Sequence, residues 1–213
     1  MKYHNLSSNI IACENFLPKH LIENIYVEFL NNRSIFKIPE WTIKDGDFDA
    51  KKNSKELFSE KCGGLDFWIN WDDMKKDSSI ESIGNWFFHQ GFFEYANMNN
   101  DNQIFSLLKR KVAWDIHVIS YNNGGYYNWH MDSSIYNLFT FNLVLNKSNN
   151  LKGGEMLFMD DGKIIEVENQ NNYMVCFPSF INHAINPLYS EDNKDVSFLE
   201  QRFSIQFWVR FSS

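Results

Sequence analysis

The stretch 139–145, FTFNLVL, decides the fold class of this 213-residue chain. Successive side chains of a β-strand point to opposite faces of the sheet, and this stretch presents an apolar face and a mixed face. Asp161-Gly162 is a favourable hairpin turn between two of the neighbouring runs with strand character. The further runs are residues 114–121, 155–159, 164–167, 173–177 and 202–211. Closely spaced strands joined by turns predict a double-sheet jelly roll.

The N-terminal part of the chain has a different pattern, with helical spacing and long polar connections. The elements expected there are a short strand at 10–12, an amphipathic helix over about 18–31 that starts at Pro18, long connections with a strand or two at 33–84, and one or two helices at 85–95. We therefore expect a mainly β chain with flanking helices. It would form a single domain over residues 1–213, with a helical and loop-rich part at about 1–111 and a jelly-roll core at about 112–211.

Composition narrows the function classes. The formal net charge is -7, whereas proteins that bind nucleic acid nonspecifically usually carry a clustered basic stripe. The three cysteines, Cys13, Cys62 and Cys176, are far apart and form no C-x-x-C pair, which argues against a zinc knuckle or a disulfide framework. We see no secretory signal and no apolar run that spans a bilayer. We expect a cytoplasmic protein that binds neither nucleic acid nor membrane.

The most informative polar residues are His130, Asp132 and His183. Residues two apart in a strand point to the same side, so His130 and Asp132 aim at one point. With His183 from a neighbouring strand or its end, two imidazoles and one carboxylate bind one face of a ferrous ion and leave the opposite positions open. Two alternatives stand beside this interpretation. In the first alternative, His130 and Asp132 form a surface polar pair. In the second, His183 is a core histidine with a satisfied hydrogen bond.

The last strand adds an inward-facing cation. Alternation places Arg202 and Ser204 on one face and apolar residues on the other. A buried arginine needs an anionic partner, which a co-substrate carboxylate provides, with Ser204 as a second donor. An ion pair with a structural acid, or an outward-facing arginine, are the alternatives. Thr140 and Asn142 lie on the mixed face of their strand and are expected to line the same pocket. Tyr121 either adds its hydroxyl to the cavity or is a half-buried strand aromatic.

Several of these residues together carry a family resemblance. They are Tyr121-x-x-Gly124-x-x-Tyr127-x-x-His130-x-Asp132, then Gly153-Gly154-Glu155, then Phe177-Pro178, His183-x-x-x-Pro187 and Arg202-x-Ser204-x-x-x-Trp208. Over about residues 112–211 the pattern resembles the Fe(II)/2-oxoglutarate-dependent dioxygenases. More narrowly, it is similar to the prolyl 4-hydroxylase-like branch, which includes bacterial and phage enzymes. The resemblance implies a double-stranded β-helix, a cupin-like jelly roll.

The resemblance also assigns roles. It implies that His130, Asp132 and His183 bind iron, and that Arg202 holds the distal carboxylate of 2-oxoglutarate with Tyr121 and Ser204 as helpers. The implied reaction uses dioxygen, hydroxylates an unactivated C–H bond and releases succinate and carbon dioxide, and the family also admits ascorbate as an accessory reductant.

The substrate is a separate question. The resemblance favours a prolyl residue in a peptide or protein. Trp129, Tyr127 and Trp208 would line such a site or serve only in packing. Two alternatives remain: the same chemistry on a free amino acid or small metabolite, and a non-enzymatic jelly-roll binding module.

One departure from the family pattern concerns Arg202. In many relatives the arginine follows the distal histidine more closely than Arg202 follows His183. The intervening segment 189–201 is polar, so we expect an inserted exposed loop. Arg210 is the nearby competitor for the same role.

Overall fold

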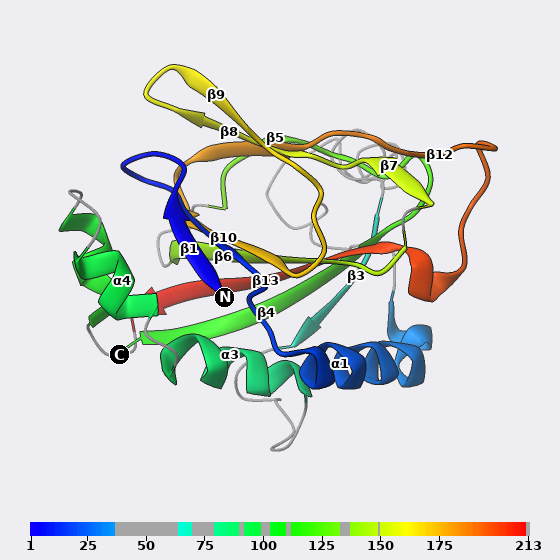
Figure 1. Ribbon diagram of the computed structural model, residues 1–213, viewed down its shortest axis with the longest axis horizontal. Coiled ribbons are helices and arrows are strands. Elements are labelled where there is room, and N and C mark those ends of the chain that lie inside the picture. Colours follow the sequence, from blue (N-terminus) through cyan, green and yellow to red (C-terminus); the bar gives the residue numbers. More distant parts are fainter. Residues whose placement is uncertain are drawn as a thin grey trace, which may run out of the picture.

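The computed structural model describes residues 1–36, 64–69, 79–89, 92–98, 103–109, 112–132, 137–148 and 150–211. Three layers are visible in Figure 1: helices on one side, a large sheet in the middle and a small sheet on the other side. This arrangement confirms the expected mainly β jelly roll with flanking helices. The single-domain organisation stays a prediction.

The two main sheets are built from strands that are distant in the sequence. In spatial order, the large sheet contains β1 (Lys2–Asn5), β2 (Ile11–Glu14), β10 (Tyr173–Pro178), β6 (Asn137–Asn146), β13 (Arg202–Phe211), β4 (Val112–Tyr121) and β3 (Gly64–Ile69). The small sheet contains β5 (Tyr127–His130), β11 (Asn182–Ile185), β8 (Met156–Asp160) and β9 (Lys163–Val167), and a separate pair joins β7 (Leu151–Gly153) to β12 (Leu188–Ser190). Within each of these three sheets, the neighbouring strands that the structure describes run antiparallel.

Helix α1 (Lys19–Asn31) covers the outer face of the large sheet. It begins after Pro18, and Leu21, Ile25 and Phe29 are buried at the spacing of one helix face. Phe29 stacks on Phe203 of β13 with ring centroids 4.7 Å apart. The other helical elements are α3 (Ser79–His89), α4 (Phe92–Met98), η1 (Arg33–Ile35), η4 (Gln103–Lys109) and η5 (Phe198–Glu200). None of the helices in the described ranges is long and apolar enough to cross a membrane.

A second apolar cluster fills the space between the two sheets. The large sheet contributes Tyr121 and Phe177, and the small sheet contributes Phe158 and Ile185. The inner face of the large sheet also carries buried polar side chains, which the helix-covered face lacks over the same stretch of β13. The polar residues of the candidate site therefore lie inside the jelly roll, between its two sheets.

Most predicted elements are confirmed. The helix, the strand near residues 10–12 and the six strand runs are present, and the predicted turn residues Asp161 and Gly162 both have positive φ, which a two-residue hairpin turn of this kind requires. Within the segment 33–84, the short helix η1, one strand and the start of α3 are described, and the remaining predictions at 37–63 and 70–78 lie outside the described residues. Strands β1, β5, β7, β11 and β12 do not appear among the predicted runs; each has only three or four residues, too few to show a clear alternation.

The segment 189–201 differs from the exposed loop that its composition predicts. Residues 191–195 are exposed, as expected. Tyr189, however, belongs to β12, and Phe198 is buried in the main core with its ring 5.4 Å from that of Phe203. A single buried aromatic therefore ties the end of this segment to the sheet just before Arg202.

Candidate metal centre and arginine pocket

Three side chains converge at one end of the space between the sheets. Strands β5 and β11 pair so that His130 and His183 face each other, and Asp132 follows the end of β5. The Nε2 atom of His130 lies 3.5 Å from Oδ1 of Asp132, and Nε2 of His183 lies 3.5 Å from Oδ2. Their possible ligand atoms all lie within 4.8 Å of one another. The predicted set is thus brought together.

Backbone carbonyl groups orient both imidazole rings. Nδ1 of His130 bonds to the carbonyl oxygen of Asn128 at 2.8 Å, and Nδ1 of His183 bonds to that of Ile181 at 2.9 Å. A carbonyl accepts only, so each Nδ1 carries the proton and each Nε2 offers a lone pair. Nε2 of His183 is buried and has no hydrogen-bond partner among the described residues. A metal ion would supply the missing partner, and two imidazole nitrogen atoms with one carboxylate are a donor set that fits ferrous iron.

The Asp132 carboxylate is held in its ionised form. Burial alone would raise its pKa, but the neighbouring His183 and His130 and a hydrogen bond from Thr140 outweigh it and lower the pKa to about 2. Oγ1 of Thr140 donates to Oδ2 of Asp132 at 2.8 Å, and Oγ of Ser179 lies 3.1 Å from Oγ1 of Thr140. This pair of hydroxyl groups fixes one carboxylate oxygen.

His183 is kept neutral in the metal-free protein. Burial lowers its pKa to about 4, against the opposing effect of Asp132. The ring packs edge-on against Phe177 at a centroid distance of 4.7 Å and lies parallel to Phe158 at 6.1 Å. A neutral imidazole in an apolar enclosure is the form that binds a metal.

Arg202 forms a second polar centre in the same interior. Its side chain is fully buried, Nε donates to Oδ1 of Asn169 at 3.2 Å, and Nη1 donates to Oγ of Ser204 at 2.7 Å. Nη2 is buried and has no hydrogen-bond partner within the described part of the chain. Burial lowers the pKa of the guanidinium to about 10, partly opposed by Tyr121 and Glu155. The group is still charged near neutral pH, and the partners that it contacts are neutral.

The backbone near Arg202 is shaped by glycine. Gly154 has a φ of 75°, and a Cβ at that position would lie 3.2 Å from Cδ of Arg202 and 3.0 Å from Nδ2 of Asn169. The ring of Tyr121 lies under the guanidinium, with its centroid 5.3 Å from Cζ. Gly154 and Tyr121 therefore lie close to the Arg202 side chain, and a carboxylate at Nη2 would complete its hydrogen bonding.

The remaining predicted site residues divide between the two centres. Ser204 and Tyr121 contact Arg202, whereas Thr140 lies at the metal centre against Asp132. Asn142 is buried on the central strand β6, and its Oδ1 has no hydrogen-bond partner among the described residues. Arg210, the competitor of Arg202, instead pairs with Asp115 through Nε at 3.2 Å and is partly exposed.

Sequence reasoning missed Asn169, Ser179 and the buried pair His117 and Gln206. Nδ1 of His117 bonds to Oε1 of Gln206 at 3.1 Å on the inner face of the large sheet. Alternation of β13 carries a signal for Gln206, which shares a face with Arg202. Asn169 and Ser179 lie outside regular strands and have no comparable signal.

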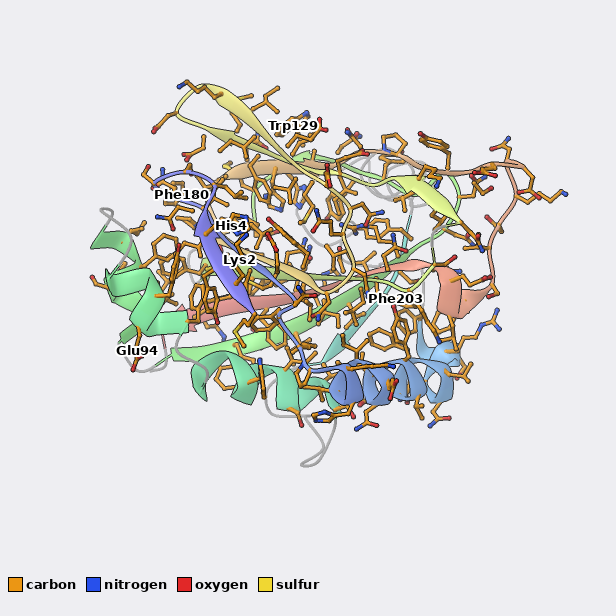
Figure 2. All side chains as sticks on the ribbon, viewed as in Figure 1. Lys2, His4, Glu94, Trp129, Phe180 and Phe203 are labelled. Atoms are coloured by element: carbon orange, nitrogen blue, oxygen red, sulfur yellow. The ribbon has the colours of Figure 1, made fainter. Side chains whose placement is uncertain are left out.

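The three aromatic residues considered for the substrate site have different environments. Tyr127 is buried and stacks on the His130 ring at a centroid distance of 3.9 Å. Trp208 lies beside the His117 ring, 5.4 Å away. Trp129 is 42% exposed on the outer side of the small sheet (Figure 2). Tyr127 and Trp208 therefore pack inside the sandwich.

Comparison with known proteins gives a family match for the region that holds both centres. Residues 116–210 match the model of the 2OG-Fe(II) oxygenase superfamily. None of the curated protein sequences compared with the chain matches it.

Solved structures of prolyl hydroxylases are similar along nearly the whole chain. A Pseudomonas putida prolyl-4-hydroxylase has a TM-score of 0.61 and 16% identity, with 96% of this chain and 93% of that chain covered. A Trichoplax adhaerens prolyl hydroxylase in complex with a hypoxia inducible factor peptide fragment has a TM-score of 0.66 and 16% identity, with coverage of 96% and 84%. The viral collagen prolyl hydroxylase of Paramecium Bursaria Chlorella virus-1 has a TM-score of 0.53 and 15% identity, with coverage of 96% and 97%. At these identities the likeness shows a shared fold.

Proposed function

Because residues 116–210 belong to the 2OG-Fe(II) oxygenase superfamily, the chain is a 2-oxoglutarate-dependent iron dioxygenase, and we propose that it hydroxylates a prolyl residue in a peptide or protein. The site assignment rests on one observation: two polar centres in the same interior each contain a buried atom that has no hydrogen-bond partner among the described residues. One centre presents a buried lone pair on His183, and the other presents a buried donor on Arg202. A metal and an anionic co-substrate satisfy both.

We assign His130, Asp132 and His183 to iron. Their convergence, the fixed Nδ1 protons and the ionised carboxylate support this assignment. Three protein ligands on one side of the metal leave positions for the co-substrate and dioxygen. When bound, the iron, with 2-oxoglutarate and dioxygen, supplies the oxidising power that hydroxylates an unactivated C–H bond and releases succinate and carbon dioxide.

We assign Arg202 to the distal carboxylate of 2-oxoglutarate. Its charge has no carboxylate partner in the described part of the chain, and Nη2 is available for a charge-assisted hydrogen bond. Ser204 supports the guanidinium through Nη1, and Tyr121 supports it through its ring face. Asn142, with a buried and unpartnered amide oxygen, is proposed to line the same pocket.

The prolyl substrate is the finer part of the proposal. The family resemblance and the prolyl hydroxylases that share the fold support it, and one of those was solved with a peptide.

The test is succinate release by the purified chain under air with ferrous iron and 2-oxoglutarate. Proline-containing peptides, matched peptides with alanine in place of proline, free proline and other free amino acids are compared. We expect stimulation by the prolyl peptides alone, with a mass gain of one oxygen atom on the peptide. Stimulation only by a free amino acid would move the substrate to the small metabolites and leave the iron chemistry in place.

We also propose a cytoplasmic location. Cys13 and Cys176 are free thiols, which suits a reducing compartment. Fractionation of cells that produce the tagged chain tests this, and recovery in an oxidising compartment would contradict it.

A further inference from the structure

Asn169, which lies outside the strands, forms a hydrogen bond with the candidate co-substrate anchor Arg202. It lies between β9 and β10 and is partly buried. Its Oδ1 accepts a hydrogen bond from Nε of Arg202 at 3.2 Å, and its Nδ2 donates to the carbonyl oxygen of Gly153 at 3.0 Å. The second bond fixes which end of the amide faces the arginine, because a carbonyl oxygen accepts only from the NH₂ group.

The neutrality of this contact matters as much as its geometry. Buried arginines usually pair with carboxylates, because an unpaired buried charge is unfavourable. Here an amide occupies the Nε position and a hydroxyl occupies the Nη1 position. Glu155, the acid whose charge acts on Arg202, accepts a hydrogen bond from Asn186 at 3.2 Å instead. The arginine is therefore oriented on two sides without being neutralised.

We propose that Asn169 is a positioning residue for the co-substrate: it orients Arg202 through a neutral oxygen and so preserves the guanidinium charge for a carboxylate at Nη2. This inference rests on the proposed function, since the ligand in question is the distal carboxylate of 2-oxoglutarate. An acid at position 169 would compete with that ligand as an internal anion. An apolar residue there would leave Nε without a partner and would free the side chain to rotate.

Two substitutions at this position separate positioning from a purely structural role. Asn169→Asp places a carboxylate against the guanidinium, and Asn169→Leu removes the hydrogen bond at similar volume. Asn171→Asp is the matched control, because it adds the same charge two residues away on the surface, where Oδ1 accepts from the backbone N–H of Asn146. The measurements are 2-oxoglutarate binding by calorimetry to the Mn(II)-loaded chain and thermal unfolding of the metal-free chain without co-substrate.

We expect Asn169→Asp and Asn169→Leu each to weaken 2-oxoglutarate binding about tenfold or more, with Mn(II) affinity unchanged, and Asn171→Asp to match the parent chain. A residue with only a structural role would lower the unfolding temperature of both variants and leave their 2-oxoglutarate affinity unchanged.

The outcomes also separate this inference from the proposed function. If the parent chain binds 2-oxoglutarate and Asn169→Asp binds it equally well, the role of Asn169 is wrong and the proposed function stands. A loss of Mn(II) affinity as large as the loss of 2-oxoglutarate affinity likewise overturns the inference, because the substitution would then disturb both centres. If the parent chain itself binds no 2-oxoglutarate, the proposed function fails first, and the ligand assigned to Arg202 fails with it.

Discussion

The two polar centres inside the sandwich solve the problem of buried charge in opposite ways. At the metal centre, the Asp132 carboxylate lies between two imidazoles and accepts a hydrogen bond from Thr140. At the arginine pocket, the guanidinium contacts an amide, a hydroxyl and an aromatic ring. The first centre therefore presents one negative charge and two imidazole nitrogen atoms to a cation, while the second presents one positive charge to an anion.

This difference indicates which ligand each centre takes. The orphaned atom of the metal centre is a lone pair on His183, which calls for a cation. The orphaned atom of the arginine pocket is an N–H donor on a charged group, which calls for an anion. Both centres border the apolar cluster that includes Tyr121, Phe158 and Phe177. An acid that chelates a metal at one end and carries a carboxylate at the other suits this interior.

The largest effect is expected from removing a metal ligand. His183→Ala should weaken Fe(II) binding by more than about 100-fold, beyond what loss of an outer hydrogen-bonding partner causes, because a buried donor atom disappears. Anaerobic Fe(II) titration measures it, with His20→Ala on the exposed face of α1 as the control. Retention of stoichiometric iron at micromolar metal by the His183 variant would refute the ligand assignment.

Removing the cation should damage the other centre selectively. Arg202→Ala is expected to raise the 2-oxoglutarate requirement about 30-fold or more, since one partner of a buried charge pair is lost, while Fe(II) affinity changes little. Arg210→Ala is the matched control, because that guanidinium pairs with Asp115 near the surface. Steady-state kinetics with varied 2-oxoglutarate compare the two. An unchanged co-substrate affinity in the Arg202 variant would assign the carboxylate to another residue.

Many residues of the two centres could be predicted from the sequence because they lie in regular strands. The spacing of Arg202 and Ser204 gave their shared face directly, because alternation in a strand has a period of two residues. His130 and Asp132 also converge as predicted, although Asp132 lies beyond the end of β5 and strand alternation does not place it. His183 gained its meaning from the family pattern, since a single histidine among apolar residues carries no direction. Most strands of the jelly roll were predicted as runs, and the five that were missed have only three or four residues each.

The contacts that could not be predicted from the sequence are those between segments that are distant along the chain. Asn169 lies in an irregular connection, and only the folded chain brings it to Arg202. Ser179 follows a strand end and meets Thr140 through the antiparallel pairing of β10 and β6. Thr140 was assigned to the anion pocket from its face alone, and its contact with Asp132 depends on the position of Asp132 after β5. Contacts of this kind have no period in the sequence.

An intermediate effect should come from the hydroxyl group that holds Asp132. Thr140→Val preserves the shape of the side chain but removes the donor to Oδ2, and losing such an outer partner typically weakens metal binding about 10- to 100-fold. Thr140→Ser retains the hydroxyl and should bind Fe(II) nearly as well as the parent chain. Equal Fe(II) affinity of the valine and serine variants would show that the hydrogen bond is dispensable. At saturating iron, Thr140→Val should bind 2-oxoglutarate nearly as well as the parent chain. A variant of the arginine pocket such as Arg202→Ala should lose 2-oxoglutarate affinity under the same conditions.

The smallest effect is expected from Ser204, which touches the arginine without carrying charge. Ser204→Ala removes the acceptor from Nη1, and a single hydrogen bond of this kind contributes about 0.5–1.5 kcal/mol, or about 2- to 10-fold in 2-oxoglutarate affinity. Without Ser204 as acceptor, Nη1 can donate a hydrogen bond to the ligand itself, which limits the loss of 2-oxoglutarate affinity. Calorimetric binding should therefore place Ser204→Ala between the parent chain and Arg202→Ala. A loss as large as that of Arg202→Ala would mean that Ser204 itself binds the co-substrate, and the arginine pocket would then have two direct ligand contacts in place of one.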